Sequence, residues 1–439
     1  MEEQEERGSP RSGDRALVLH PFLKRGDKNS SRDPEACLQE AVSLTAAISL
    51  DVIHSETVPL ATAKPGTLFG EGKLDEYADF IHSSEIDVVI IDGSVSPVQQ
   101  RNIERRLKAK VVDRTGLILE IFGDRAQTRE GVLQVELAHL SYQRTRLVRS
   151  WTHLERQRGG AGFLGGPGER QLEIDRRLID ERIVKLKRQL ETVVRTRELH
   201  RSKRKRVPYP IVALVGYTNA GKSTLFNRLT ESDVFAKDLL FATLDPTMRK
   251  IDLPGGQTVI LSDTVGFISD LPTELVAAFR ATLEEVLEAD LIVHVRDITH
   301  VDTEAQKQDV FDVLEKLGID REKEGIYLEV LNKIDLLDPE GHEYFTHEVA
   351  RRDDLLMMSA VTGEGVESFL QTVEDMITRN QKNLIVEVPT TDGASLSWIY
   401  RNGTVIERTD GEDKVILEVK FTPENLGRLE KMDLEIRKA

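Results

Sequence analysis

The stretch IVALVGYTNAGKST, residues 211–224, decides the fold of the central part of this chain. A short apolar run leads into the pattern G-x4-G-K-S, and the amphipathic segment LFNRLT follows it. Gly216 and Gly221 would let the backbone wrap around phosphate groups, whose charge the loop N–H groups and the helix N-terminus would hold. This strand–loop–helix order predicts a P-loop nucleotide-binding domain. The expected nucleotide contacts are Gly216, Tyr217, Thr218, Asn219, Ala220, Gly221, Lys222, Ser223 and Thr224.

Three residue types in and after this loop match the chemistry of phosphoryl transfer. Lys222 is expected to bind the β- and γ-phosphates, and Ser223 is expected to bind Mg²⁺. Thr243 suits a switch I position, with its hydroxyl on Mg²⁺ and its N–H on the γ-phosphate. The expected contacts in this second motif are Phe241, Ala242, Thr243, Leu244 and Asp245.

A third motif, Asp263-x-x-Gly266, follows the apolar run TVILS at 258–262. Asp263 is expected to hold the Mg²⁺ coordination shell without binding the metal directly, and the Gly266 N–H is expected to sense the γ-phosphate. We therefore assign catalytic roles to Lys222, Thr243 and Gly266. The expected contacts of this motif are Asp263, Thr264, Val265 and Gly266.

Two further motifs predict the base. The carboxylate of Asp335, in the sequence NKID, would accept hydrogen bonds from N1–H and from the exocyclic N2 amine of guanine, a donor pair that adenine lacks. The backbone after the apolar LLMM would contact guanine O6. The five motifs in this order predict GTP rather than ATP, with contacts at Asn332, Lys333, Ile334, Asp335, Ser359, Ala360 and Val361.

One position departs from the Ras-like pattern. Phe267 follows Gly266 where Ras-like proteins carry a glutamine that orients the attacking water. A phenylalanine cannot hold a water by hydrogen bonding. We therefore predict slow intrinsic hydrolysis, which a partner accelerates by ordering the switches or by supplying the missing group.

The regions on either side of this G domain (208–380) have different patterns. A polar tail at 1–15 is expected to be disordered, and 16–128 alternates apolar runs with helical segments, which predicts a small parallel α/β domain. Its clearest elements are a helix at 34–50 and a strand at 86–92. The sequence GEGK at 70–73 faintly resembles a phosphate loop, but its spacing is wrong and a turn is the preferred interpretation.

Residues 129–207 have apolar side chains at alternating spacings of three and four, which predicts an antiparallel coiled-coil hairpin. Its tip, 157–169, contains six glycines. The composition leaves two interpretations open, a tolerant linker or a loop whose backbone threads closely against a partner. The predicted seam runs through Leu133, Leu137, Leu140, Arg144, Leu147, Trp151 and Leu154, then Leu172, Ile179, Ile183, Leu186, Leu190 and Val193.

Charge is distributed unevenly along the chain. The 439 residues carry a net charge of −16, yet 144–206 holds 19 Lys and Arg against 8 Asp and Glu. That segment is therefore +11, which leaves −27 for the rest. A basic hairpin on an acidic body indicates a polyanionic partner, with RNA the preferred candidate.

Composition excludes several classes of protein. The single Cys37 rules out an internal disulfide framework and a Cys-rich zinc site. The N-terminus lacks the apolar core of a secretory signal, and no apolar run is long enough to span a membrane. We expect a cytoplasmic protein, with peripheral membrane association left open.

The last segment, 383–439, is expected to form a small ferredoxin-like α+β domain. It contains an apolar strand, a helix, a hairpin that turns at Asp410-Gly411, and a second helix. The fold class predicted for the whole chain is therefore multidomain α/β. It combines a small parallel α/β domain with its helical hairpin, a P-loop G domain and this C-terminal domain.

The chain resembles HflX-type GTPases of the TRAFAC class, which carry a hydrophobic residue in place of the catalytic glutamine. The resemblance rests on WTHLERQRGGAGFLGGPGERQLEIDRR (151–177), followed by GYTNAGKST, FATLDPT, DTVGFI, NKID and SAV. It implies a GTPase that binds the large (50S) ribosomal subunit and its 23S rRNA, with the Gly-rich tip near the peptidyl-transferase centre. It also implies the splitting of stalled or hibernating 70S ribosomes under stress, with Ser223 and Thr243 as Mg²⁺ ligands.

Two other functions stay open at this point. The chain could be a GTP- or ATP-dependent RNA-remodelling protein, or a G-protein switch that acts on a non-ribosomal protein partner. The basic hairpin favours the ribosomal function, because a switch that acts on a protein does not need it. A monomer is expected on the ribosome.

Overall fold

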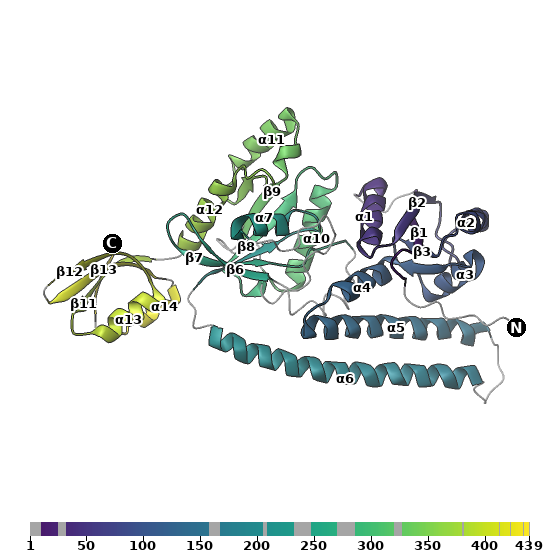
Figure 1. Ribbon diagram of the computed structural model, residues 1–439, viewed down its shortest axis with the longest axis horizontal. Helices are drawn as coiled ribbons and strands as arrows, with labels where there is room; N and C mark the ends of the chain where they lie inside the picture. Colours follow the sequence, from purple (N-terminus) through teal and green to yellow (C-terminus); the bar gives the residue numbers. More distant parts are fainter. Residues whose placement is uncertain are drawn as a thin grey trace.

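The computed structural model describes residues 10–24, 32–157, 167–204, 209–231, 247–269, 286–319, 327–379, 382–411, 413–421, 423–432 and 434–438. Three separate sheets organise these residues, and a long pair of helices runs alongside the first two (Figure 1). The predicted multidomain α/β class is confirmed.

The first sheet is parallel, with strand order β2-β1-β3-β4. The predicted helix at 34–50 is α1, whose N-terminus is capped by the Asp33 side chain, and the predicted strand at 86–92 is β3. The interpretation of 70–73 as a turn is wrong, because Gly70 is the N-cap of α2. The elements are β1 (Arg15–Leu23), α1 (Pro34–Ala47), β2 (Asp51–Leu60), α2 (Glu71–Ser83), β3 (Val88–Ile91), α3 (Pro97–Leu107), β4 (Lys110–Asp113) and α4 (Arg114–Arg125).

Two long helices, α5 (Arg129–Gln157) and α6 (Pro167–Arg204), form the hairpin. Ile183 and Leu186 of the predicted α6 seam are buried, and the ion pair between Arg182 and Glu136 links the two helices at 2.6 Å. A second face of α5, which the heptad pattern did not predict, packs Val135 and Ala138 against the N-terminal core. Residues 158–166, most of the glycine-rich tip, lie outside the described residues.

The second sheet has the order β10-β9-β8-β5-β7-β6, in which only β6 is antiparallel to its neighbour. The apolar runs at 211–215 and 258–262 form β5 and β7 of this sheet. The elements are β5 (Ile211–Val215), α7 (Lys222–Thr230), β6 (Thr247–Asp252), β7 (Thr258–Asp263), β8 (Leu291–Asp297), α10 (Thr303–Lys316), β9 (Tyr327–Asn332), the 3₁₀ turn η1 (Ile334–Leu336), α11 (Pro339–Val349), β10 (Leu355–Met357) and α12 (Val366–Arg379).

The third sheet is antiparallel, with order β12-β13-β11-β14. This order corresponds to a complete ferredoxin-like βαββαβ unit. The sequence analysis predicted the first five elements and missed the last strand, which is only four residues long. The elements are β11 (Lys382–Pro389), α13 (Gly393–Asn402), β12 (Thr404–Asp410), β13 (Lys414–Phe421), α14 (Pro423–Leu429) and β14 (Glu435–Lys438).

One continuous apolar core joins the first two sheets. It extends from Val18 of β1 through Leu38 of α1 to Tyr217 and Phe267 beside the P-loop and Val310 of α10. Because these side chains are buried together, the N-terminal domain is packed directly onto the nucleotide-binding loops.

Candidate nucleotide-binding site

The P-loop connects β5 to α7 and needs both of its glycines. A Cβ at Gly216 would lie 2.2 Å from the carbonyl oxygen of Val295, and one at Gly221 would lie 2.2 Å from Nδ2 of Asn332. Gly221 also has a φ of 94°, which disfavours any L side chain. Tight packing therefore explains this glycine spacing independently of any ligand.

Lys222, the first residue of α7, is buried beneath the loop. Its Nζ donates to the carbonyl oxygens of Gly216 at 3.0 Å and Tyr217 at 2.8 Å. Burial lowers the pKa of Lys222 to about 8, although the Asp263 carboxylate acts in the opposite direction. The polyphosphate of a nucleotide would supply the negative charge that favours the protonated amine.

Ser223, in the first turn of α7, meets Asp263 at the carboxyl end of β7. The Ser223 hydroxyl donates to Oδ2 of Asp263 at 2.8 Å, and Asp263 is fully buried at the end of β7. Hydroxyl and carboxylate oxygens are ligands that Mg²⁺ prefers. No group of three or more acidic, His or Cys side chains suited to a metal occurs among the described residues. A magnesium ion here would therefore also need phosphate and water oxygens.

The Asp263-x-x-Gly266 segment lies directly against the P-loop. A Cβ at Gly266 would meet Cγ2 of Thr218 at 2.8 Å and Nζ of Lys222 at 3.1 Å. Phe267 donates its N–H to the Gly216 carbonyl at 3.1 Å and accepts from the Thr218 N–H at 2.7 Å. The Phe267 ring is buried in the core shared with the N-terminal domain.

The two base motifs converge on the same loop through Asn332. Its Nδ2 donates to the Ala220 carbonyl at 2.8 Å, and its Oδ1 accepts from the Ala360 N–H at 2.9 Å. Asp335 is exposed at the adjoining 3₁₀ turn, whereas Ser359 is buried. The structure therefore brings three of the predicted motifs together at one place.

Arg228 is a residue of this site that the sequence analysis missed. From α7 it donates Nε to the Ala360 carbonyl at 2.6 Å and Nη2 to the Val361 carbonyl. It therefore braces the loop expected to contact guanine O6. An arginine on a helix surface carries no local signal of this role.

The N-terminal domain also contributes to the surroundings of the loop, which the sequence analysis did not foresee. The Tyr217 hydroxyl donates to Oε2 of Glu40 at 2.8 Å and accepts from the Ser269 N–H at 2.9 Å. Burial raises the pKa of Tyr217 to about 12, with the Glu40 carboxylate adding to the effect. Arg114 donates to the Ser269 hydroxyl at 2.7 Å.

Phe241 to Asp245, including the predicted switch I residue Thr243, lie outside the described residues. Their assigned roles stay predictions.

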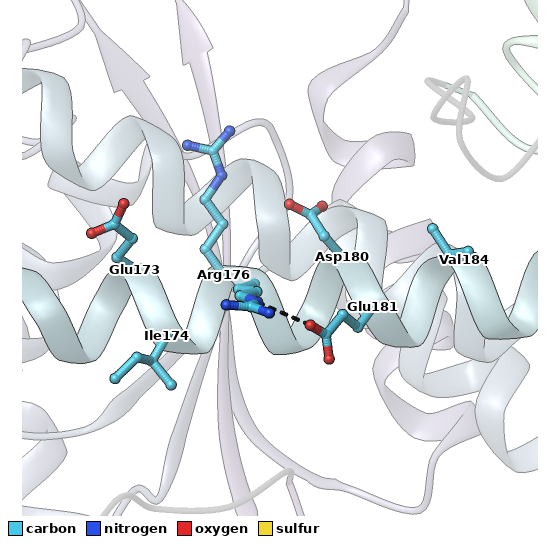
Figure 2. Close-up of a pocket in the computed structure, with 7 residues that line it drawn as sticks. Glu173, Ile174, Arg176, Asp180, Glu181 and Val184 are labelled. Carbon is cyan, nitrogen blue, oxygen red and sulfur yellow. Dashed lines mark hydrogen bonds and ion pairs between the residues drawn. The ribbon is translucent and has the colours of Figure 1, made fainter.

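An open groove elsewhere on the molecule does not belong to this site. It lies along α6, and its described lining residues all come from that helix (Figure 2). Arg177 and Glu181 pair there at 3.0 Å. Among the described lining residues, three are acidic, two are basic and all are on one open helix surface, which is not the character of a ligand pocket. Its lining is Glu173, Ile174, Arg176, Arg177, Asp180, Glu181 and Val184.

The sheet order, the glycine-bounded loop with its buried lysine, and the converging base motif define the class of P-loop GTPases. Four family models match successive parts of the chain. They are described as GTP-binding GTPase N-terminal (35–123), GTP-binding GTPase Middle Region (125–204), 50S ribosome-binding GTPase (211–333) and HflX C-terminal domain (345–437).

Relatives named GTPase HflX are similar over nearly the full length. The protein from Magnetococcus marinus is 50% identical over 95% of this chain and 94% of its own, and that from Escherichia coli is 42% identical over 93% and 94%. The chain belongs to the HflX family and is a GTP hydrolase. A GDP-bound GTP-binding protein from Sulfolobus solfataricus is 25% identical, with a TM-score of 0.44, over 83% of this chain and 99% of that one.

No described helix combines the length and apolar character that crossing a membrane requires.

Proposed function

We propose that this GTPase binds the large ribosomal subunit and splits stalled or hibernating 70S ribosomes under stress. The observation that supports this most is the connection of a guanine-nucleotide site to a long basic hairpin. The segment 144–206 carries +11 on a chain of −16. We assign the functional units as 16–128, 129–207, 208–380 and 383–439, acting as a cytoplasmic monomer on the ribosome.

The hairpin has the shape and charge for entering a cleft lined by RNA. At 1.5 Å per residue, the 38 residues of α6 extend about 57 Å. Arg176, Lys185, Lys187 and Arg188 are exposed along it. Because the rest of the chain is acidic, 23S rRNA would repel the body and attract the hairpin, which orients docking. The glycine-rich tip, 157–169, would then approach the peptidyl-transferase centre.

In the nucleotide site, Lys222 and the P-loop amides would hold the phosphates, and Asp335 would select guanine. Ser223, with Thr243, would bind Mg²⁺, and Asp263 would orient the Ser223 ligand through its hydrogen bond. Bound Mg²⁺ would neutralise charge on the β- and γ-phosphates. The Gly266 N–H would contact the γ-phosphate, which makes this glycine the sensor of the nucleotide state.

The position of Phe267 supports slow intrinsic turnover. Its ring packs into the interdomain core, so it neither reaches the phosphates nor can orient a water by hydrogen bonding. A ribosome-bound conformation would supply the missing alignment. GTP binding would favour the subunit-binding conformation, and hydrolysis would permit release.

Sedimentation of 70S ribosomes on sucrose gradients tests the proposal. Splitting is expected with GTP or a non-hydrolysable analogue and not with GDP. Failure to split with any nucleotide would contradict it. RNA strand separation driven by GTP or ATP without ribosomes would favour the RNA-remodelling alternative.

Deleting 157–169 tests the role of the hairpin tip in subunit dissociation separately from nucleotide binding. The shortened chain is expected to bind guanine nucleotides normally and to lose subunit dissociation, because the nucleotide site and the tip lie on different elements. Unimpaired splitting would refute the role of the tip. A mixed Gly/Ser replacement of equal length serves as the control for hairpin closure.

A further inference from the structure

A buried ionic cluster lies where the N-terminal sheet meets the nucleotide-binding loops. Arg114, the first residue of α4, is 6% exposed and pairs with Glu40 of α1 and, at 2.6 Å, with Asp92 after β3. Asp92 also lies 2.7 Å from Nδ1 of His20 on β1. This is the carboxyl end of β1 and β3, between which the strand order reverses, and open α/β sheets bind their ligands at such a point.

The G domain fills this position. Arg114 donates to the Ser269 hydroxyl at 2.7 Å, and Glu40 accepts from the Tyr217 hydroxyl at 2.8 Å. The Ser269 N–H donates to the same Tyr217 oxygen at 2.9 Å, which closes the circuit. Tyr217 is the second residue of the P-loop motif, and Ser269 is three residues beyond Gly266. Both nucleotide-contacting segments are therefore bound to one cluster of the N-terminal domain.

These hydrogen bonds restrain the segment that contains Gly266, the expected sensor of the γ-phosphate. Between Gly266 and Ser269, the backbone of Phe267 is hydrogen-bonded to the P-loop on both its N–H and its C=O. Gly266 is thereby held against Lys222, whose Nζ would lie 3.1 Å from a Cβ at Gly266. The Gly266 N–H is the group expected to contact a γ-phosphate. GDP has no γ-phosphate, so a closed Gly266 segment should add affinity for GTP alone.

We propose that Glu40, Arg114, Tyr217 and Ser269 form an interdomain clamp through which the N-terminal domain holds the γ-phosphate sensor closed and raises the preference for GTP over GDP. Glu40 and Arg114 are positioning residues, since they act through Tyr217 and Ser269. This inference rests on the nucleotide site proposed above. Because linkage is reciprocal, GTP must in turn strengthen the contact between the two domains.

Affinities of the full chain for GDP and for a non-hydrolysable GTP analogue test the clamp. Tyr217→Phe and Ser269→Ala each remove one hydroxyl. Each is expected to lower the preference for the GTP analogue over GDP about fivefold, the typical value of one hydrogen bond. The double variant should lose less than the product of the single effects, because both changes break one circuit.

The control is Tyr327→Phe, which also removes a hydrogen-bonded tyrosine hydroxyl of the G domain, here a partly buried one. That hydroxyl lies 2.5 Å from Nδ1 of His294 and is not part of the clamp. The control should leave the affinity ratio unchanged. A clamp variant that weakens both nucleotides equally, or neither, would overturn the proposal, because a merely structural contact does not distinguish them.

Amide exchange provides the reciprocal measurement. The GTP analogue should slow exchange in α1 and at the start of α4 more than GDP does, and Ser269→Ala should abolish that difference. Equal exchange with both nucleotides would overturn the clamp while leaving nucleotide binding intact. If the unmodified chain bound neither nucleotide, the proposed function would fail, and the clamp with it.

Discussion

The two parallel sheets of this molecule use the same position in opposite ways. In the G domain, the loop after β5 wraps its backbone around the buried Lys222, and Asp335 is exposed at the adjoining 3₁₀ turn. In the N-terminal domain, the corresponding ends of β1 and β3 are occupied by the mutually paired side chains of His20, Asp92 and Arg114. One sheet carries the candidate nucleotide site, and the other binds a segment of the neighbouring domain.

The difference shows that fold topology locates a site without deciding its occupant. Glycines that pack against Val295 and Asn332 make a backbone cradle suited to phosphate. Buried, mutually paired side chains leave no space for a ligand and hold a neighbouring domain instead. Four predictions test this contrast.

The largest effect is expected from breaking the cluster at the N-terminal sheet. Arg114→Met would leave Glu40 and Asp92 buried without their cation, at a cost of about 3–5 kcal/mol in the free energy of unfolding. The control Arg177→Met removes an exposed pair with Glu181 and should cost at most about 0.5 kcal/mol. Urea titrations followed by circular dichroism measure both. Equal costs would show that the cluster is no more than a surface contact.

A substitution in the candidate nucleotide site of the G domain should change nucleotide affinity rather than stability. Asp335→Asn replaces the acceptor for guanine N1–H and N2 and should weaken GTP binding about 100-fold, since the site would be left with unpaired donors. Xanthosine triphosphate carries an oxygen at C2 and should recover binding to the variant. Fluorescent-nucleotide titration measures both affinities. Unchanged GTP affinity would exclude Asp335 from base recognition.

The buried His294 of the G domain should make the stability of the protein depend on pH. Burial lowers the pKa of His294 to about 3, although the Glu329 carboxylate acts in the opposite direction. The folded state therefore keeps His294 neutral, while the unfolded state binds a proton near pH 6.5. Stability should therefore fall as the pH falls. The loss attributable to His294 is about 1.4 kcal/mol between pH 7.5 and 5.5.

His294→Gln removes this titration and keeps a polar partner for the Tyr327 hydroxyl. The stability difference between pH 7.5 and 5.5, from urea titrations, should be smaller in the variant by that amount. The same difference in both proteins would mean that folding does not lower the pKa of His294.

The smallest effect concerns a glycine of the N-terminal domain. Gly123 lies in α4, and nothing lies within 4 Å of an added Cβ, so Gly123→Ala should stabilise the chain by about 0.5–1 kcal/mol. Gly116 in the same helix is the control. Its Cβ would lie 3.1 Å from Val112 and should not stabilise. Thermal melts distinguish them, and a destabilised Gly123→Ala would contradict the assignment.

Much of the G domain and its site was predictable because each motif is contiguous in sequence. The strand, loop and helix around Gly216 and Lys222 carry the signal of the phosphate site within fourteen residues, and NKID carries that of the base. The second face of α5 was not predictable, since a heptad seam describes the pairing of two helices and not their docking on a third element. The strand β14 was missed because four residues give too short an alternation.

The interdomain clamp could not be predicted from the sequence. Glu40, Arg114, Tyr217 and Ser269 are separated by dozens of residues, and in sequence each is an ordinary polar side chain. No local pattern connects them, because their hydrogen bonds form only after two domains have folded and met.

The amino-acid sequence alone determined the chemistry of this protein: the GTPase class, the family, and a basic hairpin on an acidic chain. These follow from short-range spacing and from charge, which are properties of the chain before it folds. Only the tertiary structure decided that the N-terminal sheet fills its ligand position with the switch segment of the G domain, and that Phe267 is buried between them. Those outcomes depend on long-range packing, in which side chains far apart in the sequence are buried against one another.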